Sequence, residues 1–161
     1  MGLSYLGIFH TIIGITAIGA AILSYIKYGK INLAETSGKI YAINTIVTSL
    51  TALGISKHGG FNAGHVFSIL ILVLVVAAYF LHIKKQGNNR NRHIENFLLS
   101  FSFFLSWVPT VNETFTRVPL AHPLATGPSD PVIAKTLLLL FILFIAGFIY
   151  QFLKQKKTNI G

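Results

Sequence analysis

The residues with the clearest chemical potential are six histidines, in a chain that has only four acidic residues and no cysteine. Ionisable side chains within membrane-spanning segments are costly and commonly serve a function. His10 falls in the first apolar stretch and His65 opens the third. Two histidines at matched depth on two helices can ligate a b-type haem axially, so His10 and His65 are the first candidate cofactor ligands. His82 and His93 form a second, shallower pair on the opposite side.

A metal site is an alternative use of the outer histidines. Three or four histidines with a carboxylate can bind zinc or copper, and a histidine beside a carboxylate can also relay protons. The members of this set would be His10, His65, His58, Glu113 and His122. A plainer interpretation stays open, because loop and interfacial histidines often bind nothing.

Five apolar segments must position these residues. The chain is 53% hydrophobic and 11% charged, with a mean hydropathy of +0.67, whereas soluble domains average about 25% charged residues. A spanning helix needs roughly 20 mostly apolar residues. We therefore expect an all-α integral membrane bundle of about five transmembrane helices, forming a single domain over 1–161. The expected spans are 5–26, 38–55, 63–83, 94–108 and 131–152, with an outer loop over 109–130; a re-entrant segment over 94–108 is the alternative.

The distribution of cations predicts the orientation. The formal net charge is +9, and most lysines and arginines fall after the first segment, after the third and in the C-terminal tail. Because Lys and Arg mark the cytoplasmic side, we expect the N-terminus outside and the C-terminus inside. The basic character then reflects a lipid bilayer as partner rather than nucleic acid, since no basic face alternates with exposed aromatic residues.

Small and polar residues predict the inward faces. Gly7, Gly14 and Ala21 recur every seven residues, and His10 lies on the same face. Helices associate in lipid through such small residues and through polar side chains. A polar seam inside the bundle is expected from Tyr41, Asn44, Thr48, Thr51, Asn96 and Ser100. These residues either line a functional path or only hold the helices together.

Three stretches carry a resemblance to a known family: the first segment with His10 and its glycines, Gly38-Lys39-Ile40-Tyr41, and Arg92-His93. The chain resembles an uncharacterised family of small bacterial multi-pass membrane proteins, defined only as a domain of unknown function. The resemblance implies the inner membrane of a bacterium and no particular reaction. The family pattern has a His-Arg pair where this chain has Ala34 and Glu35, so any cofactor role of that pair is lost here. A fainter similarity is to four-histidine di-haem membrane cytochromes.

Three classes of function therefore remain open. The first is a redox or electron-transfer module that binds a haem or metal. The second is a small transporter or metal-handling protein in which the outer histidines receive the substrate and the polar seam forms the path. The third is a structural or accessory subunit of a larger membrane complex, or a homo-oligomer, in which the histidines are incidental. The sequence does not decide whether the protein is an enzyme.

Overall fold

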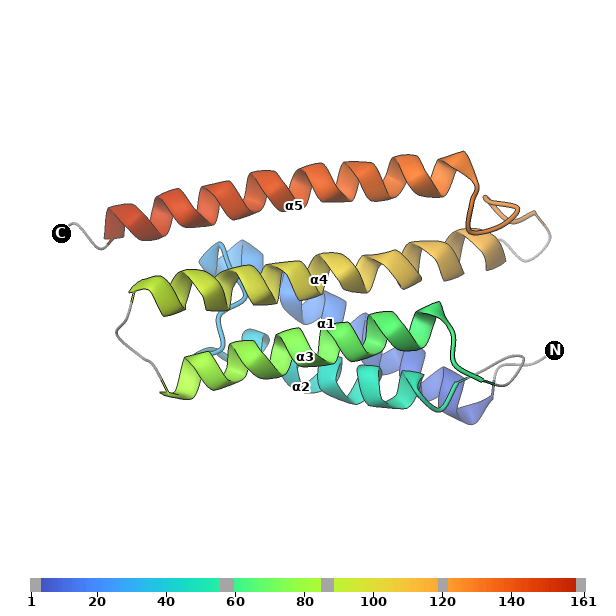
Figure 1. Ribbon diagram of the computed structural model, residues 1–161, viewed down its shortest axis with the longest axis horizontal. Coiled ribbons are helices and arrows are strands. Elements are labelled where there is room, and N and C mark those ends of the chain that lie inside the picture. Colours follow the sequence, from blue (N-terminus) through green and yellow to red (C-terminus); the bar gives the residue numbers. More distant parts are fainter. Residues whose placement is uncertain (1–3, 56–59, 85–88, 119–121, 159–161) are drawn as a thin grey trace.

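The structure is a computed structural model that describes residues 4–55, 60–84, 89–118 and 122–158. This part of the chain forms five helices and no strand, so the expected all-α bundle is confirmed. The helices run up and down, and α1 begins at the opposite end of the bundle from where α5 ends (Figure 1). Their bounds are α1 Tyr5–Tyr28, α2 Thr36–Ala52, α3 Ala63–Lys84, α4 Asn89–Arg117 and α5 Pro131–Thr158.

Four of the described helices are long and apolar enough to cross a membrane, namely α1, α3, α4 and α5. Helix α2 has 17 residues, which reach roughly 25 Å at 1.5 Å per residue. That length is short of a hydrocarbon core about 30 Å thick. The membrane-bundle class is thus supported by four helices, whereas a full crossing by α2 and the inside–outside orientation stay predictions.

Helix α4 corrects the expected boundaries of the fourth segment. The expectation was a short helix over 94–108 and a loop from Pro109, but α4 continues through Pro109 to Arg117 as one helix of 29 residues. Proline removes one backbone hydrogen bond, here the one to the Leu105 carbonyl, yet membrane helices tolerate proline in their interior. The hydroxyls beside it, on Ser106 and Thr110, donate to other carbonyls, those of Ser102 and Ser106. The connection to α5 therefore starts only after Arg117, and the described α4 contains no re-entrant turn.

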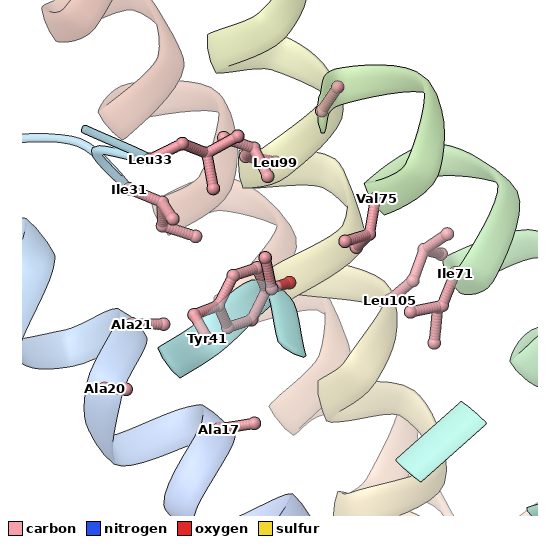
Figure 2. Close-up of a cluster of buried hydrophobic side chains, with 12 residues drawn as sticks. Ala17, Ala20, Ala21, Ile31, Leu33, Tyr41, Ile71, Val75, Leu99 and Leu105 are labelled. Atoms are coloured by element: carbon pink, nitrogen blue, oxygen red, sulfur yellow. The ribbon is translucent and has the colours of Figure 1, made fainter. Parts of the chain in front are cut away.

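Small residues bring α1 close to α2. A Cβ added at Gly14 would lie 3.5 Å from Thr48 Cγ2, and Ala17, Ala20 and Ala21 are buried in the core. Figure 2 shows these alanines on one side of Tyr41, with the side chains of α3 and α4 on the other. At the start of α2, a Cβ at Gly38 would overlap the Asn32 carbonyl. Gly38 is thus needed for close approach between backbone segments, whereas a Cβ at Gly14 would make only ordinary van der Waals contact with Thr48.

Helix α5 packs mainly against α4, through phenylalanine rings from both helices. Ring centroids lie 5.2 Å apart for Phe97 and Phe148, 5.7 Å for Phe101 and Phe144, and 5.5 Å for Phe104 and Phe141. Most other apolar side chains of α5 are exposed. A lipid-facing surface on this helix accounts for that exposure, because the bilayer is as apolar as the side chains.

Candidate functional sites inside the bundle

His10 lies on the second turn of α1, half-buried against α2. Its Nδ1 is 3.1 Å from Thr51 Oγ1, and Thr51 donates its only hydroxyl hydrogen to the Thr48 carbonyl at 3.0 Å. Thr51 must therefore accept from Nδ1–H of His10. In neutral His10 the free lone pair is then on Nε2. Metal-binding histidines use the same arrangement, with one nitrogen donating to a neighbour and the other free.

The other members of the predicted metal set do not gather around His10. Glu113 is near enough for its charge to act on His10, but its carboxylate forms an ion pair with Arg117. His122 is exposed in the connection before α5, and His58 lies outside the described residues. Within the described ranges, no three His, Cys, Asp or Glu side chains are placed to hold a metal ion.

His65 caps the start of α3. Asn62 Oδ1 accepts hydrogen bonds from the backbone N–H of Gly64 at 2.8 Å and of His65 at 3.3 Å. In return, Asn62 N donates to His65 Nδ1 at 3.0 Å. This is the reciprocal pattern of a capping box, with histidine in the place usually taken by Glu or Gln. Nδ1 is thus the acceptor, and neutral His65 carries its proton on Nε2, which is buried without a partner in the described structure.

The capping interaction of His65 affects the prediction that His10 and His65 are the two axial ligands of a haem. Axial ligation through His65 Nε2 would require the proton to move to Nδ1, which would break the hydrogen bond from Asn62. The geometry therefore leaves His10 as the histidine prepared for ligation. A cofactor role for His65 stays a prediction.

The two inner histidines contact different helices. His82, near the end of α3, forms a hydrogen bond with Glu95 of α4, with Nδ1 2.9 Å from Oε1. His93 of α4 packs its ring 4.5 Å from the ring of Phe152 on α5. Each histidine thus ties together a pair of helices, and their role as a second ligand pair stays a prediction.

The α2 part of the polar seam leaves hydrogen-bonding groups unused. Tyr41 is buried, and its hydroxyl is 2.7 Å from Ser102 Oγ, while Asn44 is half-buried. The hydroxyls of Thr45 and Thr48 are buried with no hydrogen-bond partner in the described structure, as is Asn112 Oδ1 on α4.

Hydroxyls elsewhere on the helices behave differently. Most of them donate to the carbonyl four residues earlier, which satisfies the group without any neighbour. This pattern holds for Thr11, Thr16, Ser68, Ser106, Thr110, Thr116 and Thr136. Because an unpartnered buried polar group is costly, the unused hydroxyls of Thr45 and Thr48 stand out as positions for a water or a polar guest.

The α4 part of the seam pairs with side chains that the sequence analysis did not include. Ser100 accepts from the Tyr25 hydroxyl at 2.9 Å and donates to Gln151 Oε1 at 3.2 Å. Asn96 Nδ2 donates to Gln155 Oε1 at 2.7 Å. Gln151 and Gln155 were detectable, because two glutamines four residues apart in an otherwise apolar helix share one face.

Comparison with known proteins adds no further information on these sites. No family model matches the chain, and neither a curated protein nor a solved structure is similar to it. The resemblance to an uncharacterised bacterial family therefore stays a prediction. The function must be argued from the residues themselves.

Proposed function

We propose that this protein conducts protons across a membrane along the inner face of α2, with His10 as the group that receives them at the outer end. The observation that carries the proposal is the contact between His10 Nδ1 and Thr51 Oγ1. It joins a titratable side chain to a helix face on which Thr48 and Thr45 have unused hydroxyls. The location in a bacterial inner membrane is proposed from the family resemblance alone.

The spacing of the threonines suits proton transfer through water. Thr51, Thr48 and Thr45 follow one another at intervals of three residues, or about 4.5 Å along the helix axis. One water with two to four hydrogen bonds can bridge groups at that separation. Proton transfer needs room for no more than a bridging water at each step.

His10 supplies the titratable step. Thr51 holds Nδ1–H, so Nε2 is the nitrogen that takes up and releases the proton. Histidine is the side chain whose unperturbed pKa lies nearest to neutral pH, and the proposal requires His10 to take up and release one proton at Nε2 in each transfer.

Phe103 packs against the tyrosines of both polar groups. Its ring centroid lies 6.2 Å from that of Tyr41 and 5.6 Å from that of Tyr25. Tyr41 terminates the α2 seam, and Tyr25 begins the network with Ser100 and Gln151. Under the proposal, Phe103 is the apolar barrier that limits the flow.

The test is a proton flux measurement in liposomes that contain the purified protein and a trapped pH-sensitive dye, driven by a potassium diffusion potential. The wild-type protein should give a flux above that of protein-free vesicles. His10→Ala and the double variant Thr45→Val, Thr48→Val should each lower the flux about tenfold or more, and Phe103→Ala should raise it. Thr136→Val removes an exposed hydroxyl on α5 and should change nothing. A wild-type flux equal to that of empty vesicles would overturn the proposal.

The free lone pair on His10 Nε2 also supports a second candidate, the binding of a haem or a Zn or Cu ion. An absorption spectrum and a metal analysis of the protein purified in mild detergent test it. A Soret band or stoichiometric metal that disappears in His10→Ala would favour a cofactor. A colourless and metal-free preparation would remove this candidate and leave proton conduction untouched.

A further inference from the structure

A cavity of about 110 Å³ opens at the inner end of the bundle, where α1 ends, α4 begins and α5 ends. Three cationic side chains line it: Lys30 after α1, Arg92 on α4 and Lys154 on α5. None of the described lining residues is acidic. A cavity of this volume holds roughly three to four waters, which is the room that a phosphate group requires.

The backbone around Lys30 is held in place by a buried serine. Ser24 Oγ donates to the Lys30 carbonyl at 3.0 Å and accepts from Asn32 N at 3.0 Å, and Ser24 is fully buried. Gly29, with a φ of 69°, makes the turn that leads to Lys30. A Cβ at Gly29 would lie 3.3 Å from Lys154 Nζ. The turn thus brings the loop after α1 against the cation of α5.

Gln155 provides a buried donor in the wall of the cavity. Its side chain is only 8% exposed, and Oε1 is taken by Asn96 Nδ2 at 2.7 Å. This leaves Nε2 buried and without a hydrogen-bond partner in the described structure. Buried polar groups are normally partnered by protein, water or ligand. A negatively charged acceptor oxygen would accept a hydrogen bond from Gln155 Nε2 and would also be attracted by the three neighbouring cations.

The acidic groups nearby are already engaged. Glu95 acts on Lys30 at long range, but its carboxylate is paired with His82. Glu35 accepts from the Tyr28 hydroxyl at 3.2 Å. Burial is the main cause that lowers the pKa of Lys30; the charge of Glu95 opposes it, and the charge of Arg92 lowers the pKa by a smaller amount. An anion in the cavity would offset both unfavourable effects.

We propose that this cavity binds a phosphate-type oxyanion, carried either by an anionic lipid headgroup or by free phosphate. Arg92 and Lys154 supply charge-assisted hydrogen bonds, Lys30 adds a third charge, and Gln155 donates through Nε2. The predicted orientation places this end on the cytoplasmic side, where basic pockets between membrane helices bind anionic headgroups. The inference does not depend on proton conduction, because it concerns other residues.

The test is the shift of the melting temperature of the full chain in a mild non-ionic detergent, since a ligand of the folded state raises it in proportion to binding. The probes are a short-chain phosphatidylglycerol, the matching phosphatidylcholine, and sodium phosphate against sodium chloride of equal ionic strength. Stabilisation by phosphatidylglycerol alone assigns the site to lipid headgroups, and stabilisation by phosphate as well assigns it to the oxyanion itself. No stabilisation by either, or an equal effect of phosphatidylcholine, would overturn the proposal.

Variants localise the effect. Arg92→Gln and Lys154→Gln should each weaken binding about tenfold, in line with the loss of one charge-assisted hydrogen bond. Lys135→Gln removes the same charge from an exposed position at the outer end of α5 and should leave binding unchanged. Gln155→Met keeps the shape and removes the donor, so it should weaken binding without removing a charge. If Lys135→Gln and Lys154→Gln weakened binding equally, the binding would be non-specific electrostatic attraction, which would contradict the proposed site.

Discussion

The two halves of the bundle interior are both polar, but they use their polar groups differently. In the inner half, Tyr25, Ser100 and Gln151 bond one another across three helices, and Asn96 bonds Gln155. In the outer half, the Thr45 and Thr48 hydroxyls have no partner in the described structure. Paired side chains fix how helices pack, whereas unpaired ones cost free energy unless a guest uses them. The Gln155 amide nitrogen and the Ser37 hydroxyl are exceptions in the inner half, since they too have no partner in the described structure. Under the proposal, the paired groups of the inner half serve assembly and the outer half serves transport.

This contrast predicts that the inner half is the harder place to make changes. The largest effect is expected from Gly38→Ala at the start of α2, because the new Cβ overlaps the Asn32 carbonyl, which is backbone and cannot rotate away. Strain of this kind costs about 3 kcal/mol. Unfolding in detergent, followed by circular dichroism, should show a large fall in melting temperature. Gly147→Ala on α5 is the control, since its Cβ meets nothing within 4 Å; a similar fall there would contradict the explanation.

The second prediction concerns the pair formed by Asn96 and Gln155. Asn96→Leu leaves Gln155 buried with neither end of its amide bonded, and should lower the free energy of unfolding by about 1–2 kcal/mol. The double variant with Gln155→Leu should recover part of that loss, because both polar groups are then gone. A double-mutant cycle measures the coupling. Additive effects of the two substitutions would show that the pair does not hold α4 to α5.

The third prediction compares a hydroxyl that has a side-chain hydrogen-bond partner with a hydroxyl that has none. Ser102→Ala removes the hydrogen bond to Tyr41 and should cost about 1 kcal/mol. Thr45→Val removes a hydroxyl without a partner, so its effect on the free energy of unfolding should stay within about 0.5 kcal/mol. Thermal unfolding of both variants compares them directly. A larger loss for Thr45→Val than for Ser102→Ala would mean that Thr45 is bonded in the folded protein.

The sequence predicted the inward face of His10 and the polar seam of α2, but not the contact between them. His10 shares a face with Gly7 and Gly14, and small residues are where a second helix approaches. The spacing within each helix gives its inward face, whereas the pairing of His10 with Thr51 depends on how α1 and α2 are placed along each other. The choice of nitrogen depends further on the orientation of the Thr51 hydroxyl.

Two other features could not be derived in the same way. The end of α4 was misplaced because proline commonly ends helices in soluble proteins, whereas membrane helices tolerate it in their interior and α4 continues through Pro109. The cap made by His65 was missed because histidine is unusual at that position of a capping box. The pattern Asn62-x-x-His65 contained the signal, since an N-cap residue and a side-chain acceptor three positions later are what the motif needs.

The smallest expected effect lies at the outer end, where α5 begins, and it separates stability from transport. Asp130 accepts hydrogen bonds from the backbone N–H of Thr126 and Val132, both at 3.0 Å, and these bonds lower the pKa of its carboxyl group. A carboxyl whose pKa is lower in the folded state stabilises the protein above its unfolded value of about 3.9. That contribution is lost as the pH falls through the folded value. The melting temperature of Asp130→Asn should therefore decline less between about pH 5 and about pH 3 than that of the wild-type protein. The proton flux near neutral pH should not change, because Asp130 is not part of the proposed path. If Asp130→Asn altered the proton flux but left the pH dependence of the melting temperature unchanged, Asp130 would belong to the conduction path. The distinction between stability and transport at this end of the bundle would then be contradicted.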